Sequence, residues 1–162
     1  MANTPRLLLR AETAADLMRP NPVSIRDTAT VAEATALLTD KGFSGAPVID
    51  EAGRPIGVLS RADILAHDRE RLRSPPSGSE YYMEAEIAQR QATAPGEKHA
   101  PVLVCDLMTP AVFSVAPDAT AEKVIREMLA LKVHRLFVVD AGGVLIGVIS
   151  VLDVLRHLQS EP

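Results

Sequence analysis

Residues 16–67 read DLMRPNPVSIRDTATVAEATALLTDKGFSGAPVIDEAGRPIGVLSRADILAH, and residues 106–157 repeat the pattern as DLMTPAVFSVAPDATAEKVIREMLALKVHRLFVVDAGGVLIGVISVLDVLRH. The second copy follows ninety positions later without a gap, and about a third of its positions are identical to the first. Chance identity from ordinary residue usage is only roughly one in twenty to one in ten, so the chain contains an internal duplication. A unit of about fifty residues is marginally stable by itself. We therefore expect the two copies to bury their apolar faces against each other.

Each copy has the pattern of a strand, a helix, a hairpin of two strands and a final helix. A first strand is predicted around residues 23–25, and Thr30 with Glu33 forms a capping box that begins the helix of the first copy. Thr120 stands at the same place in the second copy, but Lys123 cannot complete the box. The hairpin strands are predicted at 46–50 and 56–60 before a helix from Ser60, and at 136–140 and 145–150 before a helix from Ser150.

These elements divide the chain into four segments. We assign a lead-in to residues 1–15, a first motif to 16–67, a linker to 68–103 and a second motif to 104–160. The linker has no counterpart elsewhere in the chain. It contains a turn-forming stretch of Pro, Ser and Gly, followed by a predicted short helix over residues 80–92.

The composition argues against several classes of function. The 162 residues are 47% hydrophobic, which is enough to bury a core. Seventeen Lys and Arg against 21 Asp and Glu, with two Tyr, three Phe and no Trp, argue against nucleic-acid binding. No apolar run approaches the roughly 20 residues of a membrane span, and the N-terminus lacks a signal-peptide pattern. We expect a cytoplasmic protein without membrane contact, in which the one cysteine, Cys105, is a small buried residue rather than a reactive thiol.

The end of each hairpin has the pattern Gly, two apolar residues, Ser, two variable residues, Asp, at residues 57–63 and 147–153. A strand gives way here to a helix, whose free N–H groups and positive dipole end favour an anion such as phosphate. A carboxylate beside them can accept hydrogen bonds from the vicinal hydroxyls of a ribose. The pattern thus fits a nucleotide site. However, Ser-x-x-Asp is also a helix-start signal and Gly57 also suits close backbone packing, so the residues alone leave both interpretations open.

The duplicated unit resembles the CBS domain pair, also called the Bateman module. The resemblance rests on Asp-Leu-Met-x-Pro at the head of each copy, on Pro-Val-Ile-Asp or Phe-Val-Val-Asp in its middle, and on Gly-Val-Leu/Ile-Ser-x-x-Asp near its end. It implies an α/β (α+β) fold in which two strand-helix-strand-strand-helix motifs pack through their sheets as a pseudo-two-fold disc with two clefts. It also implies a stand-alone regulatory module that forms a homodimer and acts on an unidentified effector protein.

In this family the clefts bind adenosine compounds. The resemblance therefore implies AMP, ADP, ATP or S-adenosylmethionine as a regulatory ligand, with no cofactor required. The implied ligand-binding residues are Asp63 and Asp153 for the ribose, Ser60 and Ser150 for phosphate or ribose, Ser24 and Ser114 on the first strand, and the apolar wall of Ala46 and Pro47.

The two copies differ just before the middle strand. His134 and Arg135 of the second copy replace Ser44 and Gly45 of the first. Basic residues at this place would meet a phosphate tail, so we expect the two clefts to be unequal. The alternative is that both residues lie in solvent or pair with an acidic neighbour.

Three functions remain open on the sequence. The favoured one is a sensor of an adenosine nucleotide, and the alternative is a non-sensing interaction module whose clefts stay empty. The third is an enzyme acting on a nucleotide, with Asp63 and His67, or Asp153 and His157, as acid and base. The sequence shows no local nucleophile motif and no phosphate loop, and one Asp–His pair offers too few ligands for a metal. We therefore expect neither catalytic nor metal-binding residues.

Overall fold

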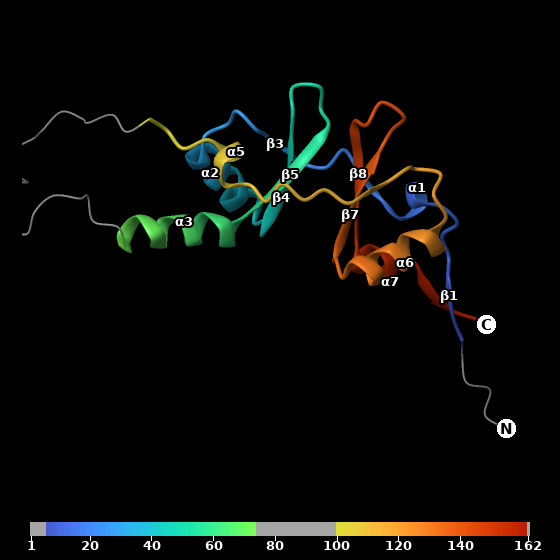
Figure 1. The fold of residues 1–162 in the computed structure, drawn as a ribbon. Helices are drawn as coiled ribbons and strands as arrows, with labels where there is room; N and C mark the ends of the chain where they lie inside the picture. The colour runs from blue at the N-terminus through green and yellow to red at the C-terminus, as the bar shows by residue number, and fades with distance from the viewer. Residues whose placement is uncertain (1–5, 74–99, 162) are drawn as a thin grey trace, which may run out of the picture.

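The computed structural model describes residues 6–73 and 100–161, and it shows a mixed α/β fold in which one unit is built twice (Figure 1). The first half of the chain forms β1 (Leu7–Leu9), α1 (Ala14–Leu17), β2 (Arg19–Pro20), β3 (Ile25–Arg26), α2 (Val31–Lys41), β4 (Gly45–Ile49), β5 (Pro55–Ser60) and α3 (Arg61–Arg73). The second half forms α5 (Val104–Leu107), β6 (Ser114–Val115), α6 (Ala121–Leu131), β7 (Arg135–Val139), β8 (Leu145–Ser150), α7 (Val151–Arg156) and β9 (Leu158–Ser160). The helix predicted over 80–92 lies outside the described residues. Within the described ranges, no helix is long and apolar enough to cross a membrane.

The helices and hairpins form where the sequence predicts them. Thr30 accepts a hydrogen bond from the N–H of Glu33 (3.2 Å), and the Glu33 carboxylate accepts one from the N–H of Thr30 (2.9 Å), which completes the capping box of α2. At α6 only the bond from the N–H of Lys123 to Thr120 (3.2 Å) forms, because a lysine side chain has no acceptor. The strand predicted at 23–25 is shorter and lies later, at β3.

Each copy carries a sheet with the same register. β3 pairs parallel with β4 and β4 pairs antiparallel with β5, so that Val48 lies opposite Gly57. β6, β7 and β8 repeat this arrangement, with Val138 opposite Gly147. The strand order is β3-β4-β5 in one sheet and β2-β8-β7-β6 in the other. The fourth strand of the second sheet, β2, therefore comes from the first repeat.

The head of each repeat packs on the other repeat. β2 pairs antiparallel with β8, which places Arg19 opposite Val148, and Thr109 makes the corresponding bridge to Val58. Figure 1 shows α1 beside α6 and α5 beside α2, and both pairs are in contact. Each sheet thus depends on a segment that belongs, by sequence, to the other copy.

Two hydrophobic cores occupy the same positions of the two copies. The shared positions include Leu38, Val48 and Leu59 in the first core and Met128, Val138 and Ile149 in the second. The exchanged heads complete them, because Val104 lies in the first core while Ala14 and Leu17 lie in the second. The copies therefore bury apolar faces against each other, as the sequence predicts, and they do so through their heads.

Gly57 and Gly147 lie where the exchanged heads cross the hairpins. A Cβ on Gly57 would stand 2.7 Å from the carbonyl oxygen of Thr109, and one on Gly147 would stand 2.9 Å from the Cγ of Met18. Side-chain carbons do not approach their neighbours this closely without movement of the surrounding chain. Close packing, which was one of the two interpretations left open by the sequence, is thus sufficient to explain the glycine of the repeated pattern.

The sequence analysis did not predict the strands β1 and β9. They pair antiparallel with Leu8 opposite Gln159, and α7 ends at Arg156 where the chain turns into β9. The expectation that Cys105 is buried is wrong. It follows the fully buried Val104 on the short helix α5, so that its side chain lies on the exposed side.

Candidate functional site

Two clefts open between the copies, and their linings follow the ninety-residue offset of the sequence. The first cleft has a volume of about 510 Å³ and the second about 410 Å³, and both lie in the range of about 300–1,000 Å³ typical of small-molecule sites. The first is lined by Ala46, Pro47, Val58, Thr109, Ala111, Phe113, Lys132, Val133, His134, Arg135, Phe137 and Val148. The second is lined by Arg19, Pro22, Val23, Gly42, Phe43, Ser44, Gly45, Pro47, Arg135, Val148, Ser150, Leu152 and Asp153.

The first cleft combines an apolar wall with a cluster of basic residues. These residues are Lys132, His134 and Arg135, which are exposed and lie just before β7 or at its start. None of the ion pairs found among the described residues involves any of the three. Their N–H groups are therefore available to an anionic ligand in the cleft.

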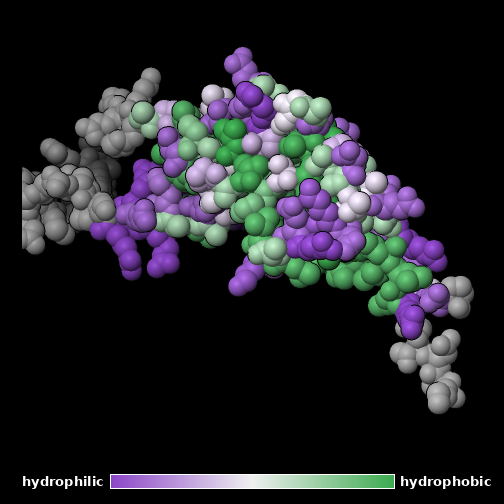
Figure 2. Space-filling model, turned by 45° about the vertical axis from the view of Figure 1, so that its right-hand side comes forward, coloured by the Kyte–Doolittle hydropathy of each residue, from purple (hydrophilic) through white to green (hydrophobic). Residues whose placement is uncertain are grey.

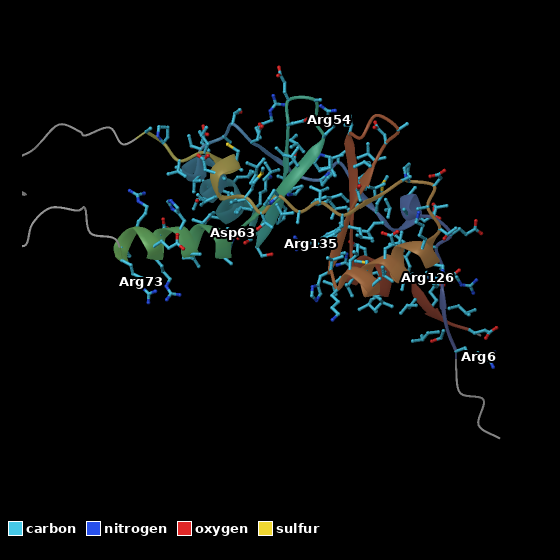
Figure 3. The ribbon with its side chains drawn as sticks, in the orientation of Figure 1. Arg6, Arg54, Asp63, Arg73, Arg126 and Arg135 are labelled. Atoms are coloured by element: carbon cyan, nitrogen blue, oxygen red, sulfur yellow. The ribbon has the colours of Figure 1, made fainter. Side chains whose placement is uncertain are left out.

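The corresponding positions of the second cleft carry no basic side chain, because Gly42, Ser44 and Gly45 replace the three basic residues. Arg135 lines both clefts. In Figure 3, Arg135 lies between the two halves of the molecule, and Asp63 lies at the end of α3 nearest to it. The two linings are thus unequal at His134, as the sequence predicts, and at Lys132, whereas Arg135 is common to both.

The Ser-x-x-Asp segments form capping boxes at the starts of α3 and α7. The Oδ2 of Asp63 accepts hydrogen bonds from the N–H (2.8 Å) and the hydroxyl (2.7 Å) of Ser60. The Oδ2 of Asp153 accepts the same two bonds from Ser150, at 2.9 and 2.6 Å. The helix-start interpretation is therefore realised in both copies. The capping box uses the Oδ2 of each carboxylate. The two copies differ in the contacts of the other oxygen, Oδ1.

The Oδ1 of Asp153 is held by two guanidinium groups. It accepts hydrogen bonds from the Nε of Arg19 (2.8 Å) and from the Nη1 of Arg156 (3.2 Å). Burial of Asp153 raises its pKa, but the hydrogen bonds from Ser150 and the guanidinium of Arg19 lower it by more, so that the pKa lies below its ordinary value of 3.8. Asp153 is therefore a charged, buried link between the head of the first repeat and the last helix of the second.

Asp153→Asn should reduce the dependence of stability on pH in acid. A carboxyl whose pKa is lowered by folding stabilises the fold above its ordinary pKa and loses this contribution as the pH falls through its folded pKa. We expect the free energy of unfolding of the variant to change less between about pH 4 and pH 2 than that of the wild type. Urea unfolding followed by circular dichroism at a series of pH values measures this. Asp16, Glu33 and Asp50, whose pKa values are also lowered by hydrogen bonds, remain in both proteins. An unchanged pH dependence would contradict the role given to Asp153.

The structure brings together most of the residues predicted from the sequence. Ala46, Pro47, His134 and Arg135 line the first cleft, and Ser150 and Asp153 line the second together with Pro47 and Arg135. Ser60 and Asp63 stand at the start of α3, where they correspond to Ser150 and Asp153, but they are not among the residues that line the first cleft.

Ser24 and Ser114 are not among the lining residues of either cleft. The residues directly before them, Val23 and Phe113, line the clefts instead. The cleft-lining positions of the first strand therefore lie one residue before the predicted serines.

The two Asp-x-x-x-His pairs do not form Asp–His side-chain contacts. The Nδ1 of His157 lies 2.7 Å from the backbone carbonyl of Asp153, and the Nδ1 of His67 lies 3.7 Å from the carboxylate of Asp68. Within the described ranges, no group of three His, Cys, Asp or Glu side chains is placed to hold a metal ion.

The paired capping boxes, the exchanged heads and the two offset clefts agree with a comparison against family models. A model described as CBS domain matches residues 14–70 and again 104–160. The chain belongs to the CBS domain family. Its fold is a pair of CBS domains, as the resemblance implied.

Relatives of this CBS pair include nucleotide-bound structures. The chain is 33% identical over 138 residues to the chloroplastic CBS domain-containing protein CBSX1 of Arabidopsis thaliana, and the match covers 82% of this chain and 57% of that protein. It is similar to a crystal structure of CBSX2 in complex with AMP, with 32% identity, a TM-score of 0.63 and coverage of 89% of this chain and 93% of the other. It is also similar to the cytosolic domain of the Mg²⁺ channel MgtE in complex with ATP, with 28% identity, a TM-score of 0.59 and coverage of 86% and 46%. The chain thus spans little more than half of CBSX1.

Proposed function

We propose that this CBS pair is a regulatory module that binds an adenine nucleotide in the first cleft. The observation that carries the proposal is the cluster of Lys132, His134 and Arg135 on one side of a cleft whose remaining lining is largely apolar. Such a site suits a ligand with a flat apolar base at one end and phosphate at the other. The complexes of CBSX2 with AMP and of MgtE with ATP, both with similar folds, support it.

Each part of the nucleotide has a matching part of the protein. The phosphates face the three basic residues, with Arg135 able to donate two parallel hydrogen bonds to phosphate oxygens. The base packs against Ala46, Pro47 and Phe113. The ribose extends beyond the cleft lining to the start of α3, where its hydroxyls donate to the Oδ1 of Asp63. Ser60 holds this carboxylate in place through its Oδ2. Ser24 and Ser114 remain predicted contacts of the base or phosphate that no cleft lining includes.

The charge of the cleft ranks the candidate ligands. AMP, ADP and ATP bring negative charge to the positively charged Lys132 and Arg135, whereas S-adenosylmethionine brings a sulfonium cation and no phosphate. Like charges repel at short range, so we propose AMP, ADP or ATP in preference to S-adenosylmethionine. No cofactor or catalytic group is required, and the nucleotide should be recovered unchanged after prolonged incubation.

A regulatory module needs a surface through which nucleotide binding changes its contact with another protein. Leu129 of α6 is 74% exposed, and Leu152 and Leu155 of α7 are also exposed. Figure 2 shows apolar surface gathered over the half of the molecule that holds these helices, whereas the far end of α3 is hydrophilic. We propose that this surface serves a homodimer or an effector protein, and that the nucleotide acts by favouring one arrangement of that contact over another. A cytoplasmic location remains a prediction, and CBSX1 is described as chloroplastic.

The exposed leucines also favour the alternative, an interaction module that binds no nucleotide. The two functions differ in calorimetry. Titration of AMP and ATP into the full chain should give saturable binding if the protein is a sensor, and no heat at millimolar nucleotide if it is only an interaction module. Light scattering on the same samples reports the oligomeric state in both cases.

Arg135→Ala should weaken ATP binding about tenfold to a hundredfold, because a hydrogen bond to a charged group contributes about 1.5–3 kcal/mol. Isothermal titration calorimetry measures the change. Arg126→Ala is the matched control, since Arg126 is an exposed arginine of α6 that pairs with Glu122 and lines neither cleft. Equal losses in both variants would show that only net charge matters and would remove Arg135 from the site.

A further inference from the structure

The carboxylates of Asp63 and Asp153, which the family resemblance assigns to the ribose, differ in how many acceptor positions are free for a ligand. A carboxylate has two oxygens with about four lone-pair sites. Asp153 already accepts four hydrogen bonds, two from Ser150, one from Arg19 and one from Arg156. Asp63 accepts two, both from Ser60 and both on Oδ2. Among the described residues, nothing donates to the Oδ1 of Asp63, whereas Asp153 has no acceptor left for a ribose.

The difference arises from two substitutions between the repeats. Thr109 of the second head occupies the position of Arg19, and Ala66 of α3 occupies that of Arg156. The backbones agree, because Arg19 lies opposite Val148 as Thr109 lies opposite Val58. A guanidinium is therefore supplied to Asp153 by the head that crosses the second sheet, and none is supplied to Asp63 by the head that crosses the first.

Arg19 acts from inside the second cleft and Arg156 from outside it. Arg19 and Asp153 both line this cleft, whereas Arg156 does not. The Asp153 side chain is only 6% exposed, while that of Arg19 is 60% exposed and extends from the cleft wall. A ribose that approached Asp153 from the cleft would have to displace Arg19 before it could reach the carboxylate.

Replacing the hydrogen bond from Arg19 to Asp153 by one from a ribose hydroxyl is unfavourable. The bond from Arg19 joins two charged groups, and such bonds are roughly twice as strong as bonds between neutral partners. A ribose hydroxyl is a neutral donor, so it replaces a stronger bond by a weaker one. Removing Arg19 also leaves the negative charge of a nearly buried carboxylate less compensated, which adds a further cost.

We propose that Arg19 excludes ribose-containing ligands from the second cleft, so that each chain binds one nucleotide, in the first cleft. This inference rests on the proposed function, because it assumes that the clefts bind nucleotides. It assigns to Arg19 the role of deciding which cleft is used. The second cleft keeps its volume, its apolar wall and Arg135, but it has no counterpart of Lys132 or His134 and no accessible acceptor for the sugar.

Calorimetric titration of AMP into the full chain tests this through stoichiometry. The wild type should bind one AMP per chain, and Arg19→Thr, which gives the first head the residue of the second, should bind two, the second more weakly because only Arg135 of the three basic residues lines the second cleft. Arg156→Ala is the matched control, because it removes a guanidinium from the same oxygen outside the cleft, and it should still bind one. Arg19→Gln, which replaces the guanidinium by a shorter and uncharged amide side chain, serves as a second opening variant. Adding Asp153→Asn to Arg19→Thr should return the stoichiometry to one, which places the new site.

Thr109→Arg provides the reciprocal test. It places a guanidinium beside Asp63 on the same backbone geometry and should abolish AMP binding, with a melting temperature that confirms folding. Two AMP per wild-type chain, or one AMP per chain in both opening variants, would overturn the inference while leaving the proposed function intact. A wild type whose single AMP is lost in Asp153→Asn and kept in Asp63→Asn would overturn it as well. Absence of AMP and ATP binding in every variant would overturn the proposed function itself, and the inference with it.

Discussion

Leu17→Ala should lower the free energy of unfolding by about 2–5 kcal/mol, the range for removing a fully buried leucine side chain. Leu17 is 1% exposed and lies in the core of the second repeat, although its sequence belongs to the first. The change leaves a cavity between α1 and the second sheet, because the surrounding core relaxes only in part. Urea unfolding monitored by circular dichroism measures the loss.

Leu107→Ala is the matched variant, because Leu107 is the counterpart of Leu17 in the second head. Leu107 is only partly buried against the first core, so its replacement should cost clearly less. Equal losses would mean that the two heads contribute alike. A loss below about 1 kcal/mol for Leu17→Ala would contradict the packing of the first head in the second core.

Gly57→Ala should destabilise the protein by about 1–3 kcal/mol, the usual cost of forcing an extra carbon into a packed site. The added Cβ would stand 2.7 Å from the carbonyl oxygen of Thr109, and this carbonyl accepts a hydrogen bond from the N–H of Val58 (3.0 Å). The backbone of the second head must therefore move away from β5. Thermal and urea unfolding measure the loss.

The same substitution should also weaken nucleotide binding, because Thr109 lines the first cleft. Gly142→Ala is the control. Gly142 lies in the exposed turn between β7 and β8, and the closest neighbour of an added Cβ would be a carboxylate oxygen of Asp140 at 3.3 Å. The control should leave both stability and affinity nearly unchanged. If the Gly57→Ala protein were as stable as the Gly142→Ala protein, the head would be able to shift without cost.

The parts of the fold that depend on neighbouring residues follow from the sequence. The capping box of Thr30 and Glu33 and the hairpin strands that follow α2 need only local patterns, and they form as predicted. The exchange of heads does not follow, because both heads begin with the same Asp-Leu-Met and fit either sheet equally by pattern. Pairing of β1 with β9 joins residues about 150 positions apart, and no local signal marks it.

The candidate site shows the same division. His134 and Arg135 could be singled out because they replace two small uncharged residues of the other copy, and both line the first cleft. Lys132 replaces Gly42 in the same comparison, so the sequence also contained a signal for Lys132. The signal was missed because Lys132 lies at the end of α6, before the strand that carries the other two residues. The same comparison marks Arg19, because Thr109 stands at its position in the other copy. It could not show that Arg19 contacts Asp153, which is 134 residues distant and meets it only through the exchanged head.

The exchanged heads also have a consequence for assembly. A single repeat cut out of this chain would lack the segment that completes its own core, and two such pieces would have to find each other in solution to replace it. Covalent linkage removes that search, since it turns an encounter between molecules into one within a molecule, at an effective concentration that can reach the millimolar range. The folding of each half is thereby made independent of how much of the protein is present.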